Sequence, residues 1–160
     1  MTILDAPHPH IAEFLAHWQG LAPEPGLLPG RRHFDPLAVP HLLPNLWLLD
    51  VERGLPSGPG RRYRVRLVGG AVVAVGFPAR PGEYFDDPRV SADIAAVRRQ
   101  LDAVVDTHRP DWRRGRPAID HTKYVDTLER VIVPLASDGR SVDMLMGLTM
   151  FYWKDGERRA

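Results

Sequence analysis

The sequence predicts an α+β fold in which helices pack on an antiparallel sheet. Two apolar runs rich in β-branched residues lie within 128–151 and flank the dipeptide Asp138-Gly139, which is typical of a β-hairpin. Apolar residues alternate with arginines from Tyr63 to Leu67, as in a strand with one buried face. Helical spacing relates a further set of apolar residues: Ile94, Val97, Leu101, Val104 and Val105. Strands joined by short turns should be antiparallel, with the long helix crossing one face of their sheet.

The chain is expected to begin with an amphipathic helix. Helical spacing relates the apolar residues Ile11, Phe14, Leu15 and Trp18. They predict a helix over residues 9–19 that ends at Gly20.

The remaining elements follow from capping and stop signals. Asp35-Pro36 predicts the start of a short helix, Ser91 is the expected N-cap of the long helix, and Arg109-Pro110 should stop that helix. In chain order we expect a short helix over 35–43, a strand over 46–51, a strand over 63–67, a short helix over 71–75, the long helix over 91–107, a strand over 115–123 and the terminal hairpin.

Composition narrows the class of protein. One domain is expected for 160 residues: a helical extension over 1–22, the main domain over 23–153 and a polar tail over 154–160. The net charge of +1 gives no electrostatic case for binding nucleic acid or an anionic membrane. The sequence contains neither a signal peptide nor an apolar run near the roughly 20 residues of a membrane helix, so the expected location is cytoplasmic.

Three segments together resemble a subgroup of small bacterial PAS-type proteins. The segments are Asp35-Pro-Leu…Leu42-Leu-Pro-Asn-Leu-Trp-Leu-Leu-Asp-Val51, Tyr63-Arg-Val-Arg-Leu-Val-Gly69 and Glu129-Arg…Pro134-Leu…Asp138-Gly…Val142-Asp-Met144. The likeness runs from about Trp18 to Phe151. It implies a five-stranded antiparallel sheet with helices over its concave face, and a ligand or merely a core between them. It also implies a sensory role and a homodimer formed through the N-terminal helix.

One face of the hairpin is the predicted pocket wall. A two-residue loop at Asp138-Gly139 would pair Leu135 with Val142 and Val133 with Met144. The face that meets the helices would then carry Glu129, Val131, Val133, Leu135, Val142, Met144, Met146 and Leu148. Methionine adapts to irregular surfaces, so this face is the candidate ligand site, with a filled core as the alternative. The ligand-binding candidates are Tyr63, Val65, Leu67, Val97, Leu101, Glu129, Val131, Val133, Met144, Met146 and Leu148.

Glu129 is the charged member of this face. A buried carboxylate needs a partner or a shifted pKa. We interpret Glu129 as paired with an arginine at the end of the sheet, and alternatively as the group that holds a polar part of a ligand. In a further alternative it is the general base of a small pocket enzyme, an isomerase-like α+β cone.

The opposite hairpin face is more apolar than a solvated surface. Leu128, Ile132, Leu145 and Phe151 lie there beside Arg130, Asp143 and Thr149, so another element should cover them. The N-terminal helix of the same chain or of a second copy is the expected cover. The candidate dimer-interface residues are Phe14, Trp18, Leu128, Ile132, Leu145 and Phe151.

The residues also bear on cofactors. A cysteine-adduct flavin is excluded because the chain has no cysteine. The PAS resemblance implies that a haem-binding relative would carry a histidine on the long helix. The helix expected over 91–107 has none, and His108 follows its end, which argues against haem. The histidines show no metal-ligand spacing and are interpreted as solvated.

We therefore expect a non-catalytic sensory or regulatory domain that binds a small molecule, a protein partner or both, and signals through association. A pocket enzyme and a ligand-free interaction scaffold are the alternatives. The cofactor and the signalling partner are left open.

Overall fold

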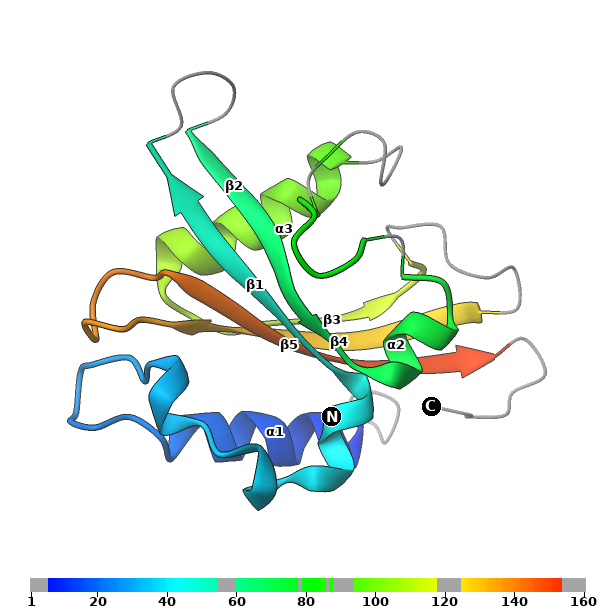
Figure 1. Ribbon diagram of the computed structural model, residues 1–160. Coiled ribbons are helices and arrows are strands. Elements are labelled where there is room, and N and C mark those ends of the chain that lie inside the picture. The colour runs from blue at the N-terminus through cyan, green and yellow to red at the C-terminus, as the bar shows by residue number, and fades with distance from the viewer. Residues whose placement is uncertain are drawn as a thin grey trace.

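The computed structural model of the chain, which describes residues 6–54, 60–77, 79–85, 87, 94–117 and 125–153, contains one antiparallel sheet with helices on both faces (Figure 1). The strands are β1 (Leu46–Arg53), β2 (Arg61–Val68), β3 (Asp111–Gly115), β4 (Val125–Leu135) and β5 (Met144–Trp153). Their order in the sheet is β2-β1-β5-β4-β3. The helices are α1 (Pro9–Gln19), α2 (Gly70–Ala74) and α3 (Ile94–Thr107), with 3₁₀ turns η2 (Arg31–His33), η3 (Pro36–Ala38) and η4 (Pro40–Asn45). The predicted α+β class and five-stranded antiparallel sheet are confirmed.

The sheet separates two apolar cores. In Figure 1, α1 lies on one side of the sheet, and α3 lies on the other. The first core, here the α1-side core, contains Ile11, Phe14 and Trp18 of α1 together with the methionines of β5. The second, the α3-side core, contains Val97, Leu101, Val104 and Val105 of α3 and apolar residues of α2 and every strand except β3. Burial of two apolar sheet faces by two helical layers accounts for the three-layer arrangement.

The prediction of which helix covers which face of the hairpin is wrong. The methionine-bearing face meets α1, whereas Leu128, Ile132, Leu145 and Phe151 meet α3. Both hairpin faces are apolar, so their period-2 pattern could not distinguish the two helices. Polar contacts fix α1 on the methionine side: the Trp18 indole Nε1 donates to the Pro134 carbonyl at 3.0 Å.

The hairpin itself is confirmed, but its loop is longer than two residues. Leu135 pairs with Met144 and Val133 with Met146. Asp138 Oδ1 accepts from the backbone N–H groups of Arg140 and Ser141 at 2.8 and 2.7 Å, which builds a wider turn. The register differs by two residues from the prediction, so the side chains of the paired strands keep their predicted faces. Val142 lies in the turn instead, and packs in the α3-side core.

The alternation in β2 is interrupted. Tyr63 and Val65 are buried as predicted, but Leu67 is 41 % exposed. The pairing of β1 with β2 shifts by one residue between Leu48 and Leu49, which is a β-bulge. An extra residue in one strand reverses the face of the residues that follow it, and this turns Leu67 outward.

The segment that follows Asp35 departs from its predicted helical form. Asp35 caps its turn as expected, since its Oδ1 accepts from the Leu37 N–H at 2.9 Å. The segment then forms the 3₁₀ turns η3 and η4, because Pro40 and Pro44 each lack the N–H that a continuous α-helix needs.

Of the strand predicted over 115–123, Gly115 lies in a strand, while Arg116 and Pro117 do not. The strand β3 covers Asp111–Gly115, and residues 118–123 lie outside the described residues. The Ser91 cap and the tail over 154–160 also lie outside them. The long helix ends at Thr107, as predicted.

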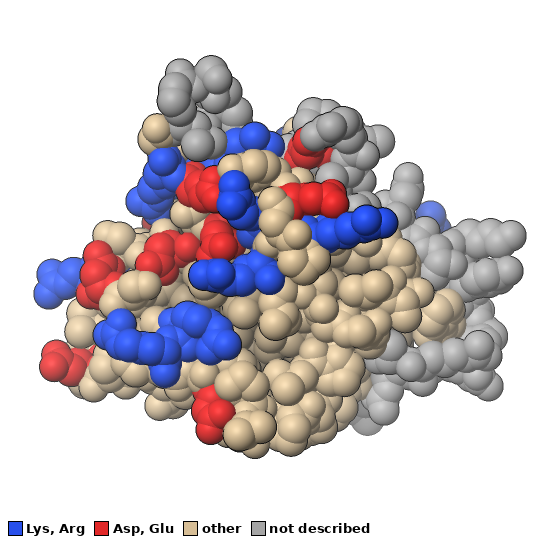
Figure 2. Space-filling model, viewed as in Figure 1, with Lys and Arg blue, Asp and Glu red and all other residues tan. Residues whose placement is uncertain are grey.

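Charged residues of both signs mix on the face over β1 and β2 (Figure 2). The Arg64 guanidinium lies 3.0 Å from the Glu52 carboxylate, and that of Arg66 lies 3.4 Å from Asp50. These cross-strand pairs contribute little to stability and keep this charged surface of β1 and β2, here called the outer face, solvated. Among the described residues, no helix has the length and apolar character that crossing a membrane requires.

Candidate functional site

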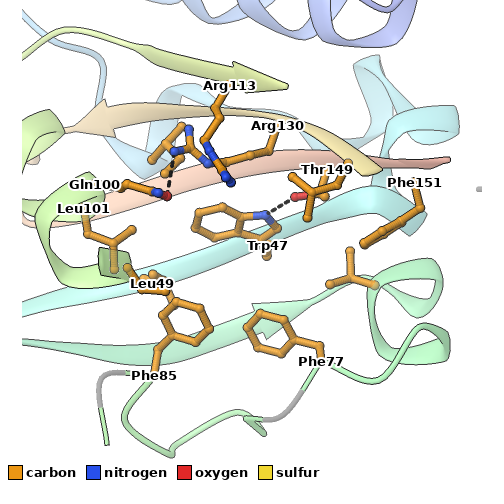
Figure 3. A pocket seen from close by; sticks show the side chains of 14 residues that line it. Trp47, Leu49, Phe77, Phe85, Gln100, Leu101, Arg113, Arg130, Thr149 and Phe151 are labelled. Atoms are coloured by element: carbon orange, nitrogen blue, oxygen red, sulfur yellow. Dashed lines mark hydrogen bonds between the residues drawn. The ribbon is translucent and has the colours of Figure 1, made fainter. Parts of the chain in front are cut away.

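A cavity of about 70 Å³ lies between the sheet and the helices on its α3 side (Figure 3). A cavity needs roughly 10–15 Å³ of such space to hold one water molecule, so this cavity is larger than a packing defect. Its apolar lining consists of Trp47, Leu49, Val72, Phe77, Phe85, Val97, Leu101, Leu128, Ile132 and Phe151. Its polar lining consists of Gln100, Arg113, Arg130 and Thr149.

The indole of Trp47 forms one wall of the cavity. Trp47 on β1 lies directly opposite Gly147 on β5. A Cβ atom at Gly147 would lie 2.0 Å from Cζ2 of that indole, so only glycine lets the ring lie against the strand. The indole Nε1 donates to Thr149 Oγ1 at 2.9 Å, which fixes the ring orientation.

The polar side of the cavity carries two arginines. Arg113 on β3 is the direct cross-strand partner of Arg130 on β4. Arg130 is buried, and its two terminal nitrogens donate to the Asp111 carbonyl and to Gln100 Oε1 at 2.9 and 2.8 Å. Arg113 is part-buried and donates to the Arg116 carbonyl at 2.8 Å. In Figure 3, both guanidinium groups point toward the Trp47 indole.

This arrangement concentrates positive charge. Burial lowers the pKa of Arg130, and the charge of Arg113 lowers it further, although the hydrogen bond and charge of Asp111 oppose both effects. Arginine stays protonated in proteins, so the two like charges persist side by side. Like charges directly opposite each other on a sheet are destabilising.

The structure places few of the predicted ligand-binding residues at this cavity. Val97 and Leu101 line it, whereas Tyr63 and Val65 are buried in the same core without lining it and Leu67 is exposed. The remaining candidates lie on the α1 side of the sheet: Glu129, Val131, Val133, Met144, Met146 and Leu148.

The predicted dimer interface is buried inside one chain. Phe14 and Trp18 pack in the α1-side core, and Leu145 in the α3-side core. The other three, Leu128, Ile132 and Phe151, line the cavity. Within the single chain these six residues are at most 9 % exposed.

Glu129 forms a separate buried site on the α1 side, and the predicted arginine partner is confirmed. Its Oε1 accepts from Arg114 at 2.8 Å and from the Tyr152 hydroxyl at 2.9 Å. Its Oε2 accepts from the Trp112 indole and the His8 backbone N–H, both at 2.8 Å. Four donors occupy the carboxylate, and it does not line the cavity. This geometry does not favour Glu129 as a general base.

Burial alone would raise the pKa of Glu129, but its hydrogen bonds from Arg114, Trp112, His8 and Tyr152 outweigh that effect and lower it. The unfolded chain therefore binds a proton more readily, and the native state is stabilised at pH values above the ordinary glutamate value of 4.5.

We expect this stabilisation to be lost as the pH falls below 4.5 toward the lower native pKa of Glu129. Glu129→Gln removes the titrating group. The difference in free energy of unfolding between wild type and variant should thus be largest near neutral pH and should shrink in acid. Urea denaturation across a pH series measures this difference, and parallel curves would contradict the assignment.

The interpretation of all histidines as solvated is wrong for His8. Its side chain is buried, and its Nδ1 accepts from the His10 N–H at 2.9 Å at the start of α1. An N-cap histidine gives no spacing signal of its own, so sequence reasoning missed it.

Sequence reasoning also missed Trp47, Gln100, Arg113, Arg130 and Thr149 as site residues. Their meeting depends on the register of β3 on β4 and of β1 on β5, which local patterns do not encode. Comparison of the sequence with protein-family models and with curated proteins gives no match.

Proposed function

We propose that this chain is a PAS-type sensory domain that binds a small molecule in the cavity between α3 and the sheet, and that it has no catalytic role. The cavity carries the proposal: a mainly apolar, aromatic-lined space with a few convergent polar groups is the usual form of a small-molecule site. The five-stranded antiparallel sheet and the helix across it are consistent with the PAS resemblance of the sequence.

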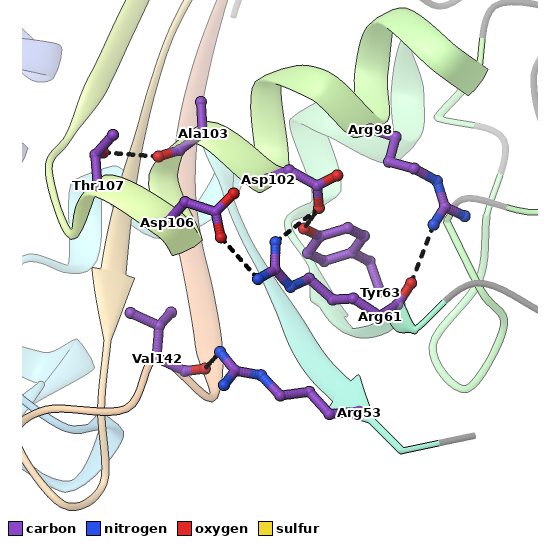
Figure 4. A network of polar contacts seen from close by, with 9 residues as sticks. All are labelled: Arg53, Arg61, Tyr63, Arg98, Asp102, Ala103, Asp106, Thr107 and Val142. Atoms are coloured by element: carbon purple, nitrogen blue, oxygen red, sulfur yellow. Dashed lines mark hydrogen bonds and ion pairs between the residues drawn. The ribbon is translucent and has the colours of Figure 1, made fainter. Parts of the chain in front are cut away.

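The helix α3 is suited to report occupancy. Val97, Gln100 and Leu101 on one of its faces line the cavity. A neighbouring face is tied to β2 by a polar network (Figure 4). Arg61 on β2 contacts Asp102 at 3.0 Å and Asp106 at 2.8 Å, and the Tyr63 hydroxyl donates to Asp102. A ligand that displaces α3 would therefore strain its contacts with β2. Since β2 is an edge strand of the sheet, another protein could bind there and respond to the change.

Native mass spectrometry of freshly purified protein tests ligand binding. We expect a bound species that disappears on denaturation. Val72→Phe places a larger side chain in the cavity wall and should abolish the bound species while the protein stays folded.

Val73→Phe is the matched control, because the adjacent Val73 side chain is 56 % exposed. This variant should keep the bound species. Equal retention of a bound molecule by both variants would place the ligand elsewhere and contradict the proposal.

A further inference from the structure

The cavity combines an unusual charge with an apolar body. Within the described residues, two guanidinium groups, Arg113 and Arg130, face one carboxylate, that of Asp111, which lies 2.8 Å from Arg130. Two positive charges against one negative charge leave one positive charge uncompensated. In the described part of the chain, the Asp111 carboxylate pairs with Arg130 and not with Arg113.

The polar groups also have unused hydrogen-bonding capacity. Arg113 carries five N–H donors, and in the described part of the chain one of its terminal nitrogens meets an acceptor, the Arg116 carbonyl. Thr149 Oγ1 already accepts from Trp47, so its hydroxyl hydrogen remains to be donated. Both groups line the same cavity and both have hydrogens to donate, so an acceptor bound there would satisfy them together.

We propose that the cavity binds a small organic carboxylate, whose anionic group lies between Arg113 and Arg130 and whose apolar part lies against Trp47. This inference rests on the proposed function and names the class of ligand. A carboxylate supplies one negative charge, matching the uncompensated positive charge, and its planar oxygens fit the guanidinium fork. The apolar lining favours an organic body over an inorganic anion.

A panel of carboxylates and their neutral amides tests the charge requirement. Each of isobutyrate, benzoate and phenylacetate is compared with its own amide (isobutyramide, benzamide and phenylacetamide). Inorganic phosphate is included as an anion without an organic body. The indole N–H signal of Trp47, assigned with Trp47→Phe, reports binding in NMR titrations. We expect at least one carboxylate to bind about tenfold or more tightly than its amide, because hydrogen bonds to charged groups are the stronger ones.

Arg113→Gln removes the charge at a part-buried side chain that makes none of the hydrogen bonds of the buried Arg130. It should abolish the preference for the carboxylate over its amide. Arg66→Gln is the matched control, since it removes the same charge from a 59 % exposed side chain on the outer face. The preference should survive in this variant.

The outcomes separate this inference from the proposed function. If an amide binds as tightly as its carboxylate, the ligand pocket stands and the anionic class is wrong. If phosphate alone binds, the organic class is wrong. If no compound on the panel shifts the Trp47 signal, the inference is overturned, while the proposed function still depends on the bound species seen by mass spectrometry.

Discussion

Replacement of Glu129 with methionine should lower the free energy of unfolding by about 3 kcal/mol, the lower end of the range for breaking a buried ion pair. Methionine is similar in length but accepts no strong hydrogen bond. The variant would remove the one carboxylate that accepts from the Arg114 guanidinium, the Trp112 and Tyr152 side chains and the His8 N–H. Arg114 and Trp112 are partly exposed and can turn to water, which is why we expect the lower end.

The same change at Glu52 is the matched control. Glu52 pairs with Arg64 at 3.0 Å and accepts from the Tyr84 hydroxyl at 2.7 Å, but this pair lies on the outer face. Glu52→Met should cost less than about 1 kcal/mol, as is usual for exposed pairs. Chemical denaturation of both variants at neutral pH measures the difference. Equal losses at the two positions would show that the burial of Glu129 adds nothing.

The location of the loss can also be checked. Glu129 joins four segments, because its donors come from the start of α1, from β3 and from β5 while it lies on β4 itself. We expect amide hydrogen exchange in α1 to accelerate more than exchange in α3, since α1 depends on the His8 contact. Uniform acceleration throughout the chain would mean that the carboxylate stabilises the whole sheet rather than the attachment of α1.

The elements that the sequence predicted well are those with strong local signals. The hairpin follows from Asp138-Gly139 between β-branched runs, and α3 follows from its apolar stripe and its Pro110 stop. By contrast, β3 is short and reads Asp-Trp-Arg-Arg-Gly, without apolar alternation. Its place in the sheet depends on pairing with β4, a tertiary contact that overrides local propensity.

The candidate site was less predictable for a related reason. Arg130 and Thr149 were correctly placed on the hairpin face with Leu128 and Phe151, but that face was assigned to a contact with the N-terminal helix. Two apolar sheet faces and two amphipathic helices allow either pairing, and the choice depends on contacts distant in sequence, such as the Trp18 indole on the Pro134 carbonyl. The bulge in β2 was equally invisible, because it exists only in the register with β1.

The second large effect is expected at Gly147, where an added methyl group should destabilise the protein by about 3 kcal/mol, near the upper end for overpacking a core. The backbone conformation at Gly147 does not require glycine, since its φ angle is not positive. The requirement is space: an alanine Cβ would lie 2.0 and 2.1 Å from two indole carbons of Trp47. The indole would have to leave the strand, lose its bond to Thr149 and enter the cavity.

Gly70→Ala is the comparison that isolates this effect. Gly70 begins α2, its φ is not positive, and no atom lies within 4 Å of a Cβ built there. Adding a methyl group should be neutral or stabilising by about 0.4–1 kcal/mol, because alanine restricts the unfolded chain more than glycine does. A large loss in this variant as well would assign the effect to the backbone rather than to the ring.

A double-mutant cycle with Trp47→Ala makes the claim specific to the pair. The three atoms nearest a Cβ at position 147 all belong to the indole, so Gly147→Ala should cost far less in a chain that lacks the indole. The two substitutions would thus be strongly non-additive. The coupling free energy measures how much of the need for glycine at position 147 comes from the Trp47 ring. Additive losses would mean that β5 needs glycine for another reason, and the wall of the cavity would lose its structural explanation.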